Sequence, residues 1–162
     1  MKETTPERVR PLPLLDDFNR AFWQGGAEGK LNIHRCRSCR RYFTPPSPVC
    51  RHCHSRDVGP EAVSGQGSVY SFTINHHRWL PNFPPPYVIA LVELAEQEGL
   101  RVFSNIVDCD VTEVTIGMPV TVGFIEQEDV FVPVFRPATR LAGTTSSLPA
   151  SAAPSRSKDS SV

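Results

Sequence analysis

The pattern of apolar and polar positions in the second half of the chain predicts an all-β domain. Five runs rich in apolar, β-branched and aromatic residues are separated by turns that contain glycine or proline. These runs cover residues 68–74, 87–94, 100–107, 120–125 and 130–135. Five short strands favour a small closed barrel of the OB type over a β-sandwich, because a sandwich usually needs about seven strands.

The first half of the chain predicts one short amphipathic helix. Apolar side chains recur at helical spacing over residues 14–23, at Leu14, Leu15, Phe18, Phe22 and Trp23. Gly25 and Gly26 then predict the end of the helix. A helix this short is marginal alone in water, so its apolar face must pack on its own domain or on a partner subunit. We therefore take Phe18, Phe22 and Trp23 as candidate partner-interface residues.

Four cysteines carry the strongest chemical signal. Cys36 and Cys39 form one C-x-x-C pair, and Cys50 and Cys53 form a second. Such pairs present thiolates at the spacing that tetrahedral zinc requires, which predicts a rubredoxin-like zinc ribbon with one structural zinc per chain. Two disulfides, a redox pair and a metal-free knuckle are the alternatives. Because four thiolates complete the site, we expect three nearby histidines to be solvated or to support the zinc ligands without binding the metal: His34, His52 and His54.

These elements divide the chain into four segments. Residues 1–30 form an N-terminal coil and helix, residues 31–58 the zinc ribbon, and residues 59–137 the barrel. Residues 138–162 are rich in Ser, Ala, Pro and Thr and contain no aromatic residue, which predicts a disordered tail. No segment has the roughly eighteen successive apolar residues of a membrane span, and residues 1–9 lack the core of a signal peptide, so we expect a cytoplasmic protein.

Charge is balanced overall but divided along the chain. Lys+Arg and Asp+Glu both number 17, so the chain lacks the basic excess of a typical nucleic-acid binder. Residues 30–58 carry seven basic groups and one acid, a net charge of +6, whereas residues 59–136 carry three basic groups and ten acids, a net charge of −7. Binding of single strands therefore stays a weaker alternative, because the barrel repels phosphate. Its aromatic residues fall within the strand runs, and we expect several of the four to be core residues: Tyr70, Phe72, Tyr87 and Phe103.

Taken together, these motifs resemble a family of zinc-ribbon plus OB-fold proteins long classified as a domain of unknown function. The resemblance covers residues 14–137 and is carried by Phe22-Trp23, Cys36, Cys39, Pro45-Pro46, Cys50, Cys53, Gly65, Gly67, Val69 to Thr73, Pro86-Tyr87, Ile116 to Val120 and Phe135 to Pro137. It implies a partner of thiolase-like acyl-CoA enzymes, including lipid-transfer-protein-like aldolases, with the chemistry in the partner. One departure is that Arg40 and Ser55 stand where many members have glycine after the knuckle.

We therefore expect a non-catalytic accessory subunit that stabilises a thiolase-like partner and helps to shape its acyl-CoA entrance. Arginine forks suit the phosphates of coenzyme A, and the candidates are Arg37, Arg40, Arg41 and Arg51. Any one of them is equally consistent with an ordinary solvated charge. An independent enzyme is a weaker hypothesis, because His76, His77, Asp108 and Cys109 complete no recognisable triad.

The loop from His76 to Pro86 completes the candidate interface. Its prolines restrict the unbound loop and so lower the entropy lost on docking. It carries Arg78, Trp79 and Phe83, and tryptophan and arginine are enriched at interface hot spots. The alternative is that Trp79 and Phe83 only cover one end of the barrel.

Overall fold

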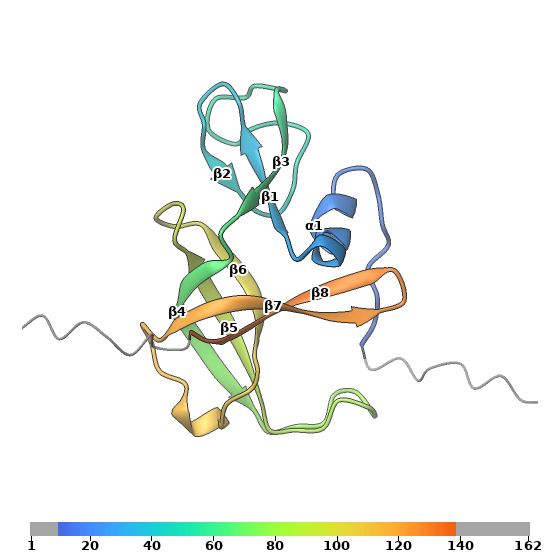
Figure 1. The fold of residues 1–162 in the computed structure, drawn as a ribbon, viewed down its shortest axis with the longest axis vertical. Helices are drawn as coiled ribbons and strands as arrows, with labels where there is room; N and C mark the ends of the chain where they lie inside the picture. Colours follow the sequence, from blue (N-terminus) through green and yellow to red (C-terminus); the bar gives the residue numbers. More distant parts are fainter. Residues whose placement is uncertain (1–9, 139–162) are drawn as a thin grey trace, which may run out of the picture.

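The computed structural model describes residues 10–138. A zinc-ribbon sheet stands at one end of a closed barrel, and a short helix lies beside both (Figure 1). The predicted tail, residues 138–162, falls outside the described residues except for its first residue. The class expected from the sequence is confirmed: mainly β, with one short helix, a ribbon and a five-stranded barrel.

The barrel contains the five predicted strands. They are β4 (Gln66–Asn75), β5 (Tyr87–Leu94), β6 (Arg101–Ile106), β7 (Pro119–Gln127) and β8 (Val130–Pro137). The strands close in the order β4-β5-β6-β8-β7. All neighbours are antiparallel except β6 and β8, which meet in parallel at Ile106 and Phe135. A register shift between Val69 and Ser71 bends the long strand β4, which pairs with β5 along most of its length and with β7 at its start.

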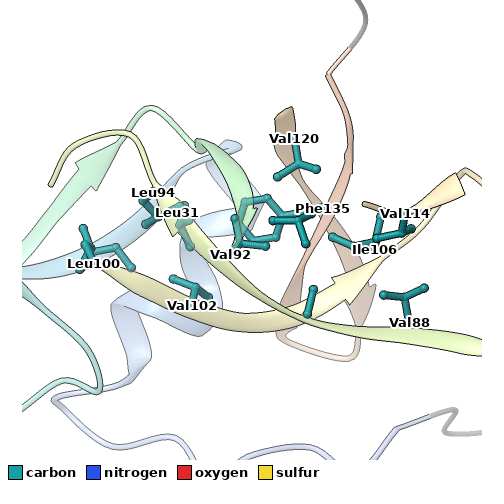
Figure 2. Packing of buried hydrophobic residues seen from close by; sticks show 13 residues of the cluster. Leu31, Val88, Val92, Leu94, Leu100, Val102, Ile106, Val114, Val120 and Phe135 are labelled. Carbon is teal, nitrogen blue, oxygen red and sulfur yellow. The ribbon is translucent and has the colours of Figure 1, made fainter. Parts of the chain in front are cut away.

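The barrel interior is filled by the inward positions of the strands. Along β5 burial alternates strictly, so that Val88, Ala90, Val92 and Leu94 point inward. Phe135 of β8 is fully buried among them (Figure 2). The ribbon strand β1 adds Leu31, which lies beside Leu94, and Ile33 to this same cluster. The base of the ribbon is therefore part of the barrel core.

The ribbon is a three-stranded sheet in the order β2-β1-β3. Its strands are β1 (Leu31–Cys36), β2 (Tyr42–Phe43) and β3 (Val58–Val63). Strand β3, which the apolar pattern did not predict, pairs with the whole of β1 from Leu31↔Val63 to Cys36↔Val58. It contains Gly59 and Pro60, and a proline is tolerated there because β3 is an edge strand.

The N-terminal helix is shorter than predicted and continues differently. Helix α1 spans only Arg20–Gln24, and a 3-10 turn, η1 (Gly25–Glu28), follows it. Before α1, Asp16 Oδ1 accepts hydrogen bonds from the backbone N–H groups of Phe18 (2.9 Å) and Asn19 (2.7 Å), while Asn19 Oδ1 accepts from the Asp16 N–H (2.9 Å). These local bonds replace a helical turn and explain why the predicted helix over residues 14–23 was wrong in extent.

The α-helix ends at Gln24 with Gly25 as its C-cap, as predicted, but the chain continues directly into the 3-10 turn η1. The chain ends its helical path at Gly29, which has a left-handed φ of 69°. A Cβ on Gly26 would lie 2.4 Å from the Phe131 Cβ atom and 2.6 Å from the ring of Phe124. Gly26 therefore also lets η1 pack closely against the β7–β8 hairpin.

Side-chain hydrogen bonds join the ribbon to the β5–β6 hairpin. Gln97 accepts from the Tyr42 N–H (2.9 Å) and donates to the Tyr42 carbonyl (3.1 Å), as a neighbouring strand would. The Thr44 hydroxyl donates to the carbonyl of Arg101 at 2.9 Å. Together with Leu31 and Ile33 in the core, these bonds orient the ribbon on the barrel.

Candidate metal centre and docking groove

The four predicted ligand cysteines come together at the tip of the ribbon. Their Sγ atoms all lie within 4.8 Å of one another, with Cys36 and Cys53 at 3.5 Å and Cys39 and Cys50 at 3.6 Å. A tetrahedral zinc with Zn–S bonds of about 2.3 Å requires sulfur separations of about 3.8 Å. The arrangement fits one structural zinc held by these four thiolates.

Backbone N–H groups of each knuckle stabilise the thiolate form. The Cys39 N–H points at Cys36 Sγ (3.5 Å) and lowers the pKa of Cys36 to about 6. The N–H groups of Cys53 and His52 lower the pKa of Cys50 in the same way. Thiolates are the form that binds metal, so these N–H groups favour the metal-binding form of Cys36 and Cys50.

Each knuckle ends on a left-handed residue that is not glycine. Arg40 has φ 62° and follows Cys39, while His54 has φ 59° and follows Cys53. The second position is therefore His54 rather than Ser55, which we had aligned with the family glycine. Both backbones carry a modest conformational penalty that glycine would not have.

The histidines near the cysteines have different surroundings. His52 and His54 are exposed, as expected. His34 is 7% exposed, and its Nε2 lies 3.1 Å from the Phe18 carbonyl oxygen, to which it donates. The imidazole also packs edge-on against Phe43, with ring centroids 5.9 Å apart. His34 thus anchors the N-terminal segment to β1, and the expectation that it is solvated or supports the zinc site was wrong.

The four candidate phosphate-binding arginines all lie on the exposed surface of the ribbon. Arg37 forms an ion pair with Asp57 at 3.0 Å. Arg40 and Arg41 follow the first knuckle, and Arg51 lies within the second. None of the four lines the hollows described below.

The proline-rich loop separates into an exposed tip and a packed base. At the tip, Trp79 is 70% exposed, stacks edge-on against His77, and donates its indole N–H to Asn75 Oδ1 at 2.9 Å. Arg78 beside it is exposed. At the base, Phe83 is half-buried against Tyr87, with ring centroids 4.3 Å apart.

The outer face of β5 and β6 carries the main apolar feature of the described surface. Directly opposed residues there form three cross-strand pairs: Glu93 with Arg101, Leu91 with Phe103, and Ile89 with Asn105. Glu93 and Arg101 form an ion pair of 2.8 Å. Phe103 is 75% exposed, an unusual position for phenylalanine in the middle of a strand.

Two hollows flank Phe103 and form what we call the docking groove. The ribbon-side hollow, about 680 Å³, lies between α1, the segment Phe43–Pro46 and the β5–β6 face. The loop-side hollow, about 370 Å³, lies between the N-terminal coil, the base of the proline-rich loop and the same face. Phe22, Trp23 and Phe103 line both hollows. Of the predicted interface residues, Phe18, Phe22, Trp23 and Phe83 therefore come together here, whereas Arg78 and Trp79 do not.

Two of the four barrel aromatics from which we expected several core residues are exposed. These are Phe103 and Tyr70, which is 46% exposed and lies under the Arg101 guanidinium at 3.4 Å. The signal was present in the strand period: Val102 points inward, so its neighbour Phe103 must point outward. Phe72 and Tyr87 are half-buried.

Two family models match consecutive parts of the chain. A rubredoxin-like zinc-ribbon domain of ChsH2 matches residues 23–59, and the C-terminal OB-fold domain of ChsH2 matches residues 60–124. A DUF35 domain-containing scaffold protein of Methanothermobacter thermautotrophicus is 35% identical over 102 residues, which is 58% of this chain and 71% of that protein. The chain belongs to the DUF35 family.

Longer relatives contain this DUF35 unit as a part. The chain is 39% identical over 137 residues to a probable enoyl-CoA hydratase alpha subunit of Thermomonospora curvata, covering 84% of this chain and 42% of the relative. It is 36% identical over 110 residues to the 3-oxo-4,17-pregnadiene-20-carboxyl-CoA hydratase alpha subunit of Mycobacterium tuberculosis, covering 67% and 34%. The chain thus spans less than half the length of these two curated relatives.

A solved structure extends the similarity to the whole described fold. A chain of the Ltp2-ChsH2(DUF35) aldolase superposes with a TM-score of 0.70 at 38% identity, covering 78% of this chain and 98% of that chain.

Within residues 10–138, no helix is long and apolar enough to cross a membrane.

Proposed function

We propose that this DUF35 protein is a non-catalytic accessory subunit of a thiolase-like acyl-CoA enzyme, and that it docks through the groove around Phe103. Its similarity to a chain of the Ltp2-ChsH2(DUF35) aldolase supports the kind of assembly. The observation that carries the proposal is the exposed ring of Phe103 on β6, flanked by two hollows that the half-buried Phe22 and Trp23 of α1 also line. Such apolar surface is rarely left exposed without a partner.

The described residues favour a docking role over catalysis. Burial, reinforced by Glu113, Asp110 and Asp108, raises the pKa of the Cys109 thiol and so keeps it protonated and unreactive. His77 stacks on Trp79 in an exposed loop, where its ring supports the tryptophan. Chemistry on the acyl group is therefore assigned to the partner.

The ribbon has a separate role in this proposal. The net charge of +6 over residues 30–58 attracts anions, and Arg40, Arg41 and Arg51 are exposed beside the zinc knuckles. We propose that they face the phosphates of coenzyme A at the partner's entrance. Arg37 is a weaker candidate because Asp57 already occupies its guanidinium.

Single-strand binding is the second candidate, since exposed Phe103 lies on the barrel face that OB folds use for oligonucleotides. That face is bordered by the ribbon and α1, and its cation, Arg101, is paired with Glu93. The barrel charge of −7 further opposes phosphate binding. A titration with single-stranded DNA at physiological salt is expected to show only weak binding, and sub-micromolar affinity would favour this alternative.

The docking proposal is tested by a matched pair of variants. Phe103→Ser removes the ring between the two hollows, whereas Ile116→Ser removes an equally exposed side chain (72%) from the connection between β6 and β7. With a co-expressed thiolase-like enzyme, Phe103→Ser should weaken the complex by about 1.5–3 kcal/mol, which is roughly a 10- to 150-fold rise in the dissociation constant. Ile116→Ser should leave the dissociation constant unchanged. Equal effects of the two variants, or none, would place the interface elsewhere.

A further inference from the structure

Arg10 is held firmly at the edge of the loop-side hollow. Its backbone N–H donates to Gln127 Oε1 at 3.3 Å, and its carbonyl accepts from Gln127 Nε2 at 2.7 Å. Its Nη1 donates to Asn105 Oδ1 at 2.6 Å, and Asn105 is itself held by a bond to the Val88 carbonyl. Arg10 is thus tied to both β6 and β7, and its guanidinium has a defined position.

No described carboxylate pairs with this guanidinium. The described ion pairs use other cations, and Glu93, the acid on the same face, is taken by Arg101. The Arg10 guanidinium instead lies over the ring of Phe83, 4.4 Å from its centroid. Burial lowers the pKa of Arg10, which reflects a cation partly removed from water. Among residues 10–138 the guanidinium has one hydrogen-bond partner, the neutral amide oxygen of Asn105, so four of its five N–H donors have no partner among those residues.

Apart from Arg10, the hollow is lined mainly by apolar side chains, and its neutral polar members are Tyr87, Ser104 and Asn105. Trp23, Phe83 and Phe103 bring aromatic surface to it from α1, the loop and β6. Arg10 is the one charged side chain among the described residues that line it. The hollow therefore combines a single partly desolvated cation with apolar walls.

We propose that this hollow receives a carboxylate side chain carried on an apolar segment of the protein partner, and that Arg10 forms a forked ion pair with it. The planar guanidinium matches a carboxylate with two parallel hydrogen bonds. Residues flanking the acid pack against the aromatic walls, a combination of arginine and aromatic anchors that is frequent at interface hot spots.

A single carboxylate matches this hollow better than a phosphate does. A phosphate group carries more than one negative charge and is usually held by several cations or by backbone N–H groups at a helix N-terminus. The hollow offers one arginine among neutral, mostly apolar side chains, and this arginine balances a single negative charge. The inference takes from the proposed function only that the occupant is a protein.

The test needs no identified partner. A displayed library of short random peptides is selected on the zinc-loaded chain, and the enriched peptides are expected to carry Asp or Glu beside large apolar residues. A synthetic enriched peptide should bind the Arg10→Gln variant about tenfold or more weakly, and Arg10→Lys, which lacks the fork, should fall between. Arg136→Gln, which removes an exposed arginine paired with Asp108, is the matched control and should bind normally.

A second substitution tests the pair from the peptide side. Changing the peptide's acid to its amide should weaken binding to the wild-type chain and have little further effect on Arg10→Gln. Selection of non-acidic peptides, an unchanged affinity of Arg10→Gln, or no selection at all would overturn the inference. Displacement of the peptide by pyrophosphate or coenzyme A at equal concentration would also overturn it, in favour of a phosphate site. A thiolase-like enzyme that failed to bind the chain would refute the proposed function alone.

Discussion

Removing zinc should unfold the tip of the ribbon while leaving its base on the barrel. The sheet spans two separate clusters: Leu31 and Ile33 of β1 are each 1% exposed within the barrel core, whereas Cys36 belongs to a small cluster at the tip. Apart from the cysteines, that tip cluster contains one fully packed large side chain, Phe43. The two ends of the same strands therefore depend on different forces.

The stabilising free energies at the base and at the tip of the ribbon come from different sources. Burying Leu31 and Ile33 contributes about 3–6 kcal/mol in total, and this contribution does not involve the metal. Burying Phe43 contributes about 1.5–3 kcal/mol, which is small beside the roughly 10–16 kcal/mol by which structural zinc stabilises comparable sites. Without zinc, residues 36–58 lose most of what orders them.

Amide hydrogen exchange measures this directly. A chelator, or Cys36→Ser, should abolish protection at Cys36 and Val58 while preserving it around Leu31, Ile33 and the barrel strands. Cys109→Ser, which changes the one cysteine outside the cluster, should alter neither zinc content nor exchange. Unchanged protection of residues 36–58 without zinc, or loss of protection throughout the barrel, would refute this division.

Two further changes test the ribbon's other contacts. Gln97→Ala leaves the partly buried N–H and C=O of Tyr42 without partners, and should lower the free energy of unfolding in urea by about 1–3 kcal/mol and speed exchange of the Tyr42 amide. The Tyr42 hydroxyl, with Arg35, lowers the pKa of Glu61, so the carboxylate stabilises the fold above its ordinary pKa near 4 and this contribution is lost on acidification. Glu61→Gln should therefore lower the melting temperature at pH 7 and change it little near pH 3; an equal loss at both would contradict this.

The sequence was sufficient to predict those features that depend on a local residue pattern. The C-x-x-C pairs impose their own geometry, and Cys36, Cys39, Cys50 and Cys53 converge as predicted. The five barrel strands follow from their apolar runs. The alternation of side chains along the strand also indicates that Phe103 points outward. Because aromatic residues are usually buried, an exposed phenylalanine in a strand was not expected.

Features decided by tertiary contacts were missed. Strand β3 carries Gly59 and Pro60 and forms only because β1 offers an edge. The first part of the predicted helix is replaced by the Asp16–Asn19 turn, and Gly26 allows the close contact with β7 and β8. The position of Arg10 depends on Asn105, which is distant in the chain, so no local sequence motif predicts that position.

Native mass spectrometry of this chain, co-expressed with a thiolase-like acyl-CoA enzyme from the same genome, tests the central claim most directly. The account predicts a mixed assembly in which each copy of this chain carries one zinc ion, and predicts that Phe103→Ser releases the chain with its zinc still bound. Separate species for the wild-type proteins, or a mixed assembly that persists in full with Phe103→Ser, would contradict docking through the groove on β5 and β6.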